Sequence, residues 1–386
     1  MMKIAIIGTR GVPNHYGGFE QFAEYLAKGL VERGHDITVY NSHSHPYQES
    51  EWNGVKLVHC NDPEDSWGTA GQFVYDLNCI LHTRSQNYDI ILQLGYTSST
   101  VWGWLLPRKN TIITTNMDGL EWKRTKYSKL VRAFLKKAEY LGTVFSDYWI
   151  SDSLGIQDYL TKKYNISSTY IPYGAYPFEN PDVADLASYN VSPGNYNMLI
   201  ARLEPENNVD TILEGVSLAD NKAPFLVVGK HNTKYGEYLK SKYAGFSNIR
   251  FLGGIYDINV LNNVRHYANI YFHGHSVGGT NPSLLEAMAS HTLICAHKNE
   301  FNSTILEDDA LYFDNSQQVK AVVDSSRKED LISFADNNVH KIRNIYEWNN
   351  IIDKYENHFK TIYSTKHEVR DNNVAGRLPD QAKYLS

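Results

Sequence analysis

The chain has 386 residues, a formal net charge of −6 and a charged fraction of 21%. This length is too great for one compact α/β core and fits two domains. A mildly acidic chain excludes nucleic acid as the main partner, since a phosphate backbone demands a basic face. The cysteines Cys60, Cys79 and Cys295 show neither paired spacing nor a zinc pattern. We therefore expect reduced thiols in a cytoplasmic protein.

A βαβ unit opens the chain. Residues 3–7 form a short apolar run, which is typical of a buried parallel strand. A glycine-rich loop follows, reading GTRGVP at residues 8–13 and YGGFE at residues 16–20. An amphipathic helix then ends at Gly34, before a strand over residues 36–40. The loop is too long for the dinucleotide fingerprint and the second strand lacks its acidic end, so NAD binding is disfavoured.

Strands and helices alternate in both halves of the chain, and the fold class is predicted as α/β with two Rossmann-like domains facing across a cleft. The polar segment 177–195 lacks an apolar period and marks the boundary. We expect an N-terminal domain over 1–178 and a C-terminal domain over 179–345. A C-terminal helix within 346–386 should pack back toward the first domain and end in a loose tail from about Asp371. Further strands are expected at 90–94, 111–115, 148–151, 169–172, 196–201, 225–229, 249–252, 270–272 and 293–296.

Residues 273–289, which read HGHSVGGTNPSLLEAMA, are the most informative segment. A strand runs into a glycine turn, and Asn281 and Ser283 supply cap oxygens for a helix that starts at Pro282. A helix N-terminus behind such a turn presents N–H groups and a positive dipole end to a phosphate. Glu286 stands one turn further, where a carboxylate can reach ribose hydroxyls. The alternative is an ordinary α/β turn with a surface glutamate.

Two aspartates of the first half are candidate acceptor-side groups. Asp118 follows a predicted strand, where its carboxylate could orient or deprotonate an acceptor hydroxyl. Asp152 also ends a strand and precedes a helix. For both residues, a helix cap is the alternative role. His273 and His275 flank the glycine turn and are candidates for contact with a donor sugar, the alternative being that they are core histidines.

A helix predicted over residues 122–141 carries a basic face and an apolar face. Such a helix is typical of contact with an anionic membrane surface. The alternative is a solvated helix that packs its apolar stripe into the N-terminal domain. The basic face consists of Lys126, Lys129, Arg132, Lys136 and Lys137, and the apolar face of Tyr127, Leu130, Val131, Phe134 and Ala138.

Taken together, the N-terminal loop, the stretch ARLEPEN at residues 201–207 and the helix over 282–289 resemble glycosyltransferase family 4. The N-terminal loop is more specific, and resembles the bacterial subgroup of rhamnosyltransferases that assemble surface polysaccharides. The resemblance extends to about residue 365. It implies the two-domain GT-B fold and retaining transfer from a nucleotide sugar.

The resemblance also implies roles for single residues. Glu286 matches the second Glu of the family's Glu–seven residues–Glu motif and should bind ribose, while Gly278 stands where the first Glu would be. Arg202 matches the residue that pairs with the donor diphosphate, but the family's Lys nearby is absent, and Lys230 could restore that charge. The predicted catalytic residues are Asp118, Asp152 and Arg202. The predicted donor-binding residues are Gly17, Gly18, Arg202, Lys230, His273, His275, Gly279, Thr280, Asn281, Ser283, Leu284 and Glu286.

The sequence thus predicts a retaining glycosyltransferase that moves a 6-deoxyhexose, L-rhamnose from dTDP-rhamnose, onto a lipid-linked saccharide acceptor. No Asp-x-Asp pair stands at a strand end, so we expect transfer without a metal or other cofactor. Peripheral contact with the inner face of the cytoplasmic membrane is part of this hypothesis. The alternatives are another donor sugar nucleotide, a sugar-nucleotide 2-epimerase on the same scaffold, and an inactive protein that binds sugar nucleotides or glycans.

Overall fold

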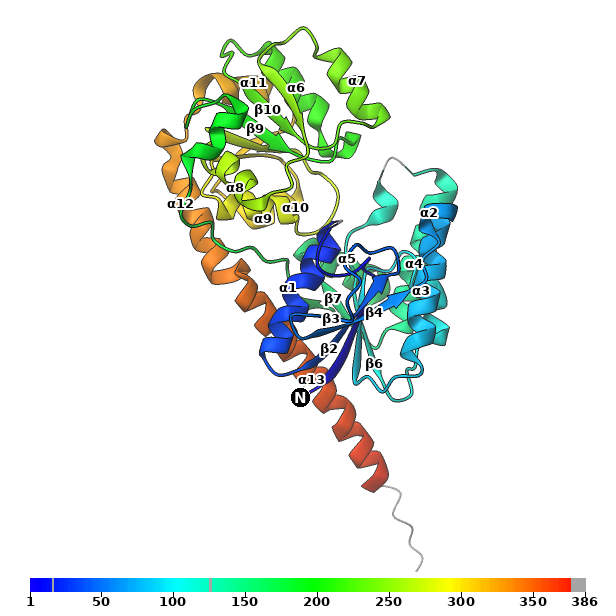
Figure 1. The fold of residues 1–386 in the computed structure, drawn as a ribbon. Coiled ribbons are helices and arrows are strands. Elements are labelled where there is room, and N and C mark those ends of the chain that lie inside the picture. The colour runs from blue at the N-terminus through cyan, green and yellow to red at the C-terminus, as the bar shows by residue number, and fades with distance from the viewer. Residues whose placement is uncertain (16, 125–126, 376–386) are drawn as a thin grey trace, which may run out of the picture. The chain divides into compact units, whose positions relative to one another are not determined.

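The computed structural model describes residues 1–15, 17–124 and 127–375, the last nine of these as backbone only. The chain divides into two units (Figure 1). The first contains Met1–Met117, Ala138–Ile150 and Ile352–Ser386, and the second contains Asp118–Lys137 and Ser151–Ile351. Residues 118–137 and 151–178, which we assigned to the N-terminal domain, therefore group with the second unit. Side chains in these two segments contact residues 202–204 and 275–280, which accounts for the grouping.

The first sheet has the strand order β3-β4-β2-β1-β5-β6-β7-β8. Strands β1, β2, β4, β5, β6 and β7 pair in parallel, whereas β3 runs antiparallel to β4. The order reverses at β1, which lies between β2 and β5. The strands are β1 (Lys3–Ile7), β2 (Asp36–Ser42), β3 (Glu51–Trp52), β4 (Val55–Cys60), β5 (Ile90–Leu94), β6 (Ile112–Asn116), β7 (Tyr148–Ser151) and β8 (Thr169–Tyr170).

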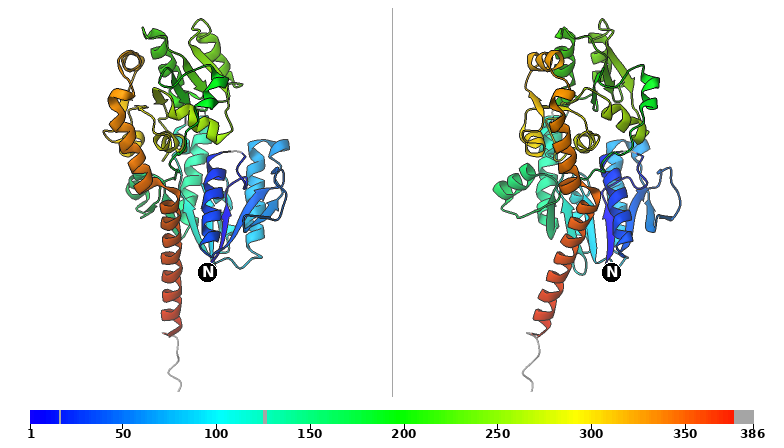
Figure 2. Two further views of the ribbon diagram at one scale, coloured as in Figure 1. Left: turned by 60° about the vertical axis from the view of Figure 1, so that its left-hand side comes forward. Right: turned by 90° about the vertical axis from the view of Figure 1, so that its left-hand side faces the viewer.

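Helices cover both faces of this sheet. Ala5 and Ile7 pack with α3 (Thr69–Thr83) on one face. On the other face, α1 (Gly18–Glu32) packs with α13 (Trp348–Ala375), a long helix seen from two sides in Figure 2. Alternate residues of a strand point to opposite faces, so burial on both sides explains the continuous apolar runs.

The second sheet is parallel throughout, with the strand order β11-β10-β9-β12-β13-β14. Leu199 and Phe272 face a core formed with helices α6 (Val209–Leu218), α7 (Lys234–Lys242) and α11 (Ser316–Ser325). Tyr271 points to the opposite face, toward α9 (Pro282–Ala289). The order reverses at β9, between β10 and β12. The strands are β9 (Asn197–Ile200), β10 (Phe225–Val228), β11 (Ile249–Gly253), β12 (Ile270–His273), β13 (Ile294–His297) and β14 (Leu311–Phe313).

Two Rossmann-like domains with parallel sheets confirm the predicted fold class. Every strand that we predicted is present, whereas β3, β4 and β14 were missed. Among the described residues, no helix combines the length and apolar character needed to cross a bilayer. The remaining helices are α2 (Glu64–Trp67), α4 (Lys129–Phe145), α5 (Leu154–Tyr164), α6 (Val209–Leu218), α7 (Lys234–Lys242), α8 (Ile258–His266), α9 (Pro282–Ala289), α10 (Glu300–Leu306), α11 (Ser316–Ser325) and α12 (Ile332–Lys341).

The basic helix differs from its prediction. The predicted helix over 122–141 is wrong at both ends, since α4 begins at Lys129 and ends at Phe145. Arg124 has an extended backbone, which ends the short 3₁₀ turn before it and interrupts any longer helix. Leu130 is 84% exposed, Val131 40% and Phe134 39%, so this part of the predicted apolar face is at the surface. Ala138 is buried and Tyr127 is half-buried, so the face packs into the core only in part. Lys126 and Tyr16 lie outside the described residues.

The start of the tail also differs from its prediction, and residues 376–386 lie outside the described residues. Helix α13 continues to Ala375, past Asp371, where we expected the chain to lose regular structure. Extending an existing helix adds one hydrogen bond for each residue fixed, so a polar sequence can prolong it.

Candidate active site

The glycine turn after β12 leads into helix α9, as predicted. Asn281 caps the helix, since its side-chain oxygen accepts a hydrogen bond of 2.9 Å from the Ser283 amide. The Leu284 amide donates to the Asn281 carbonyl at 3.0 Å, and the Leu284 side chain is buried. Both amides are thus engaged by Asn281 in this structure, and their role as phosphate donors remains a prediction.

The loop after β9 lies beside this turn because β9 and β12 are neighbours in the sheet. Asn207 Nδ2 donates to the Arg202 carbonyl at 2.7 Å, and Asn208 Nδ2 donates to the Gly274 carbonyl at 2.8 Å. Ser276 donates to the Glu206 carbonyl at 2.7 Å through its hydroxyl group. The residues that replace the family's lysine therefore fasten the Arg202 loop to the glycine turn, and Arg202 itself is exposed.

Asp118, which is half-buried, and Asp152, which is buried, form a pair of neighbouring carboxyl groups in the second unit. Burial, followed by the charge of Glu121, raises the pKa of Asp118 to about 6. Burial and the neighbouring Asp118 raise the pKa of Asp152 well above its usual range. No described N–H or O–H group donates to either side-chain oxygen of Asp152. A nearby carboxylate disfavours ionisation of a second carboxyl group, so the charge of Asp118 adds to the effect of burial on Asp152.

Neither aspartate caps a helix. Ser153 caps α5, because its hydroxyl accepts a hydrogen bond of 3.3 Å from the Ile156 amide. The 3₁₀ turn near Asp118 has no side-chain cap. Instead, Asp152 packs against the glycine turn, where Thr280 donates its hydroxyl to the Asp152 carbonyl. A Cβ atom on Gly279 would collide with both Asp152 side-chain oxygens. The capping alternative is therefore wrong for both residues, whereas their catalytic role remains a prediction.

Charged groups surround this carboxyl pair. Arg124 bonds to Glu121 Oε1 at 2.8 Å and lies 3.8 Å from Glu204 Oε2. The positive charges of Arg124 and Arg202 both oppose the rise in the Asp118 pKa, so both guanidinium groups are close to it. Sequence reasoning missed Arg124 and Glu121, although they follow Asp118 within the same short segment. A Glu–Arg pair at i, i+3 beside a candidate carboxylate was the available signal.

The two histidines of the turn are uncharged. Burial, together with the charges of Arg202 and Arg124, lowers the pKa of His275 to about 3. Burial, followed by His275, lowers the pKa of His273 well below its usual range. Their rings stack with centroids 4.4 Å apart, and no described group bonds to either ring nitrogen of His273. His273 is buried, as in the core alternative, but its unsatisfied nitrogens leave a ligand role open.

Glu286 pairs with a residue that sequence reasoning missed. Arg265 Nη2 lies 2.5 Å from Glu286 Oε2, and the arginine side chain is only 1% exposed. Glu286 is therefore not a simple surface glutamate. The available signal was that Arg265 in α8 is four residues after the buried Leu261, which places it on the apolar face of that helix.

Lys230 follows β10, next to the end of β9, and its Nζ lies 5.8 Å from the centroid of the Tyr256 ring. Gly17 and Gly18 belong to the first unit, where α1 begins at Gly18. Glu20 orders their loop by accepting hydrogen bonds from the Thr9 hydroxyl at 3.1 Å and the Arg10 amide at 2.8 Å. The donor-binding roles of these residues remain predictions.

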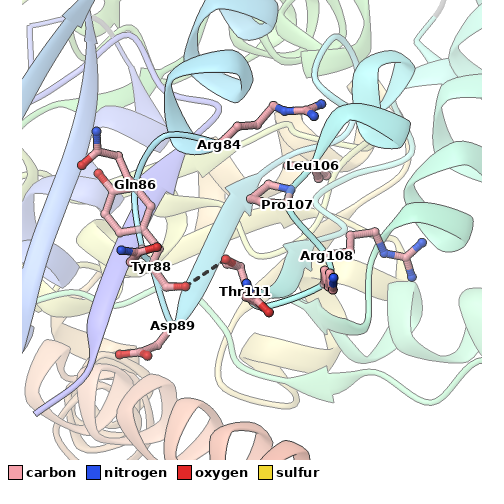
Figure 3. Close-up of a pocket in the computed structure, with 11 residues that line it drawn as sticks. Arg84, Gln86, Tyr88, Asp89, Leu106, Pro107, Arg108 and Thr111 are labelled. Atoms are coloured by element: carbon pink, nitrogen blue, oxygen red, sulfur yellow. Dashed lines mark hydrogen bonds between the residues drawn. The ribbon is translucent and has the colours of Figure 1, made fainter.

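Each unit also contains a surface cavity. The cavity of the first unit, about 460 Å³, is lined by residues 84–89 and 106–111, which precede β5 and β6 (Figure 3). Ligands of open α/β sheets bind at the carboxyl ends of strands, so this position does not fit the predicted site. The cavity of the second unit, about 470 Å³, is lined by Leu120, Tyr159 and Phe301 and by Lys123, Lys162 and Lys163, among others. Leu120, which lines this cavity, is two residues after Asp118 in the chain.

No group of three or more His, Cys, Asp or Glu residues that could hold a metal ion occurs in the described part of the chain. Transfer without a metal remains a prediction.

Solved structures of GT-B glycosyltransferases share this two-domain α/β fold. Sucrose-phosphate synthase from Thermosynechococcus elongatus superposes with a TM-score of 0.75 at 16% identity, over 95% of this chain and 100% of that one. Anabaena HepE in complex with UDP-glucose gives 0.72 at 13% identity, over 94% and 100%. WaaG, a glycosyltransferase involved in lipopolysaccharide biosynthesis, gives 0.68 at 16% identity, over 91% and 98%.

Two family models each match one part of the chain. Residues 190–331 match the family Glycosyl transferases group 1, and residues 1–176 match the domain of unknown function DUF1972. The chain thus combines a glycosyltransferase group 1 domain with a DUF1972 N-terminal region. An uncharacterized protein of the cps region of Klebsiella pneumoniae is 35% identical over 70 residues, which cover 18% of this chain and 19% of that protein.

Proposed function

We propose that this protein is a retaining glycosyltransferase that moves L-rhamnose from dTDP-rhamnose onto a lipid-linked saccharide in surface-polysaccharide synthesis. The observation that carries the proposal is the convergence of Arg202, the Asp118–Asp152 pair and the glycine turn in the second unit. The neighbours that were solved with UDP or UDP-glucose and the relative from a cps region support a nucleotide-sugar donor and a polysaccharide product.

The proposed chemistry assigns a role to each group. The acceptor hydroxyl attacks the anomeric carbon while the bond from that carbon to the diphosphate oxygen breaks. The leaving oxygen gains negative charge, which the Arg202 guanidinium stabilises as it develops. In retaining transfer on one face of the sugar, this phosphate oxygen takes the acceptor proton. The ionised Asp118 orients the acceptor hydroxyl, and the neutral Asp152 can donate its proton in a hydrogen bond to a sugar oxygen.

The acceptor side of the proposal draws on the cavity beside Asp118. Three lysines, the acidic residues Asp158 and Glu300, and the aromatic rings of Tyr159 and Phe301 line it. Lys162 is paired with Asp158 at 2.6 Å, and the three positive and two negative side chains together give the lining a net charge of +1. Ammonium groups suit a phosphate-bearing acceptor, and aromatic rings suit the apolar faces of sugars. Helix α4 begins nearby in the chain and exposes Leu130 beside Lys129, a combination that suits peripheral contact with the anionic inner face of the cytoplasmic membrane.

The decisive experiment incubates the purified protein with a panel of sugar nucleotides and lipid-linked acceptors and identifies the products by mass. The proposal predicts a deoxyhexose increment on the acceptor with dTDP-rhamnose, undiminished in excess EDTA. Conversion of the donor without acceptor would favour the epimerase alternative. Donor binding without any product would favour the inactive binding protein, and a product with another donor would replace rhamnose.

A further inference from the structure

Two of the three cysteines lie beside each other in the core of the first unit. Cys60 is the last residue of β4, and Cys79 lies in α3. Both side chains belong to the hydrophobic core between the sheet and α3. The thiol of Cys79 is hydrogen-bonded to the sulfur of Cys60. A second contact holds the two segments together one residue away, because Asn78 Nδ2 donates to the Asn61 carbonyl at 2.9 Å.

The two thiols differ in exposure and in acidity. Cys60 is 8% exposed at the end of its strand, whereas Cys79 is 0% exposed. The hydrogen bond from Cys79 lowers the pKa of Cys60 and outweighs the opposing effect of burial. Burial, followed by the hydrogen bond and the charge of Cys60, raises the pKa of Cys79. The thiolate is the reactive form of cysteine, so Cys60 is the thiol that a small oxidant attacks first, with Cys79 in contact to react next.

We propose that Cys60 and Cys79 are a peroxide-sensitive pair that forms a reversible disulfide, and that this cross-link fastens residues 61–78 to the first unit. In the first step, the Cys60 thiolate attacks one peroxide oxygen, the O–O bond breaks, and a sulfenic acid and hydroxide form. In the second step, the Cys79 sulfur attacks the sulfenic sulfur, the S–S bond forms, and the sulfenic hydroxyl leaves as water with the Cys79 proton. The peroxide gains two electrons, one from each sulfur.

The segment between the two cysteines carries a contact to the glycine-rich loop that follows β1. Glu64 lies in this segment, and its Oε1 lies 2.7 Å from Arg10 Nη2. Gln72 Nε2, from the same segment, donates to Glu64 Oε1 at 3.2 Å. In the chain-entropy model, a disulfide that closes such a loop stabilises the folded state because it restricts the unfolded chain. The cross-link should therefore raise the melting temperature of the unit in which Glu64 holds Arg10.

Oxidation of the purified wild-type protein tests this proposal without any substrate. The protein is treated with hydrogen peroxide, unfolded in the presence of an alkylating reagent and digested, and the peptides are identified by mass. We expect a disulfide between Cys60 and Cys79 and a melting temperature higher by about 5 °C, both reversed by dithiothreitol. Cys295 is the internal control and should stay a free thiol, because it is buried in the second unit and burial raises its pKa. Three free thiols after oxidation, or a cross-link that leaves the melting temperature unchanged, would overturn the proposal.

Serine variants test the order in which the two thiols react. In Cys79→Ser, the sulfenic acid of Cys60 lacks its partner and should be captured by dimedone. In Cys60→Ser, Cys79 should not react with dimedone, and Cys295→Ser should form the cross-link as the wild type does. Near-ultraviolet circular dichroism reports whether each variant is folded. Capture at Cys79, or no capture at Cys60, in a folded variant would refute the assigned order, and if neither variant folds, the wild-type peptides decide.

Discussion

The Asp152 carboxyl group occupies the space that a side chain at position 279 would need, since a Cβ atom built on Gly279 would collide with both carboxyl oxygens. This packing joins the end of β7 to the glycine turn after β12, two segments far apart in the sequence. The loop therefore needs a glycine at this position for steric reasons. The adjacent Gly278, in contrast, has open space around it and a φ of +130°.

Gly279→Ala tests this packing. The added methyl group must displace the buried carboxyl group, so we expect a loss of about 1–3 kcal/mol in the free energy of unfolding. Denaturant unfolding measures this loss, with Gly245→Ala as the control because a Cβ atom there meets nothing within 4 Å. In an Asp152→Ala background, Gly279→Ala should reduce the free energy of unfolding by a clearly smaller amount. Equal costs in both backgrounds would contradict the proposed collision.

The raised pKa of Asp118 makes stability depend on pH. Its folded-state pKa is about 6, above the ordinary value of 3.8, so the folded state retains a proton that the unfolded state loses between these values. Stability therefore decreases as pH rises from about 4 to about 6, by roughly 3 kcal/mol. Asp118→Asn lacks this titration. The stability of the variant relative to wild type should increase through that window and stay level above it, whereas a flat difference would show that Asp118 is not buried in this way.

Activity should also depend on the ionisation of Asp118. It should rise with pH over the range in which stability falls. If the ionised Asp118 orients the acceptor hydroxyl, kcat/KM should rise about tenfold per pH unit below pH 6 and level off above it. In Asp118→Asn, a rate-versus-pH profile should be lower throughout and lose this acidic limb. If kcat/KM of the variant still fell below pH 6 as it does in the wild type, an ionisable group other than Asp118 would be responsible for that fall.

The fold was predictable from periodicity, because strands buried on both faces, such as Ile90–Leu94, read as continuous apolar runs. The edge strand β3 has only two residues and gives no such run. The start of the basic helix was mispredicted because amphipathic spacing continues through Arg124, where the backbone is extended and the guanidinium lies 3.8 Å from Glu204, a residue distant in the sequence. The local sequence pattern cannot show where a contact distant in the sequence prevents a residue from adopting the helical conformation.

For the candidate site, the sequence indicated which loops carry the site residues but not which side chains those residues contact. Neighbouring strand ends bring Arg202 and His275 together, as topology predicts. Nothing in the local pattern shows that the proton affinity of Asp152 is raised above that of a free carboxyl group, because the pKa of Asp152 depends on burial and on the charge of Asp118. Similarly, Glu286 reads as a free carboxylate until Arg265 is placed beside it by the packing of α8 on α9.

Arg202→Ala should reduce turnover by about two to three orders of magnitude, the usual loss when one donor to a developing oxyanion is removed. Arg202 is exposed, so the fold should survive. A second readout is independent of activity. Arg202 helps to lower the pKa of His275, so that pKa, measured by NMR titration, should rise in the variant. Arg327→Ala, another exposed arginine of the same unit, is the control. Wild-type turnover in Arg202→Ala would remove this residue from the proposed site.

The first two turns of α4 predict how the protein meets a membrane. Leu130, Val131 and Phe134 are exposed beside Lys129 and Lys137, so apolar insertion and charge attraction are both available. Arg132 donates to the Lys123 carbonyl and Lys136 lies 4.3 Å from the Trp122 ring centroid, so these two also have structural contacts. Lys129 and Lys137 are both exposed, and the charge variant is Lys129→Glu with Lys137→Glu.

Each lysine near an anionic surface contributes on the order of 1 kcal/mol, and salt screens the attraction over a Debye length of about 10 Å at 0.1 M. Binding to vesicles that contain anionic lipid should therefore be clear at low salt and weaken steeply as salt rises. The double charge reversal should reduce vesicle binding about a thousandfold, because two favourable charges become unfavourable. Lys222→Glu with Lys298→Glu changes the net charge equally at exposed positions of the second unit and should leave binding much closer to wild type.

The apolar contribution is tested separately by Leu130→Ser with Phe134→Ser. These exposed side chains lose apolar area without a change of charge, so the weak binding that persists at high salt should disappear while low-salt attraction remains. Transfer to a lipid-linked acceptor should slow in both double variants, and transfer to a short soluble acceptor should be spared. If both double variants bind vesicles as the parent does, the basic and apolar surface of α4 serves another purpose and the membrane role must be abandoned.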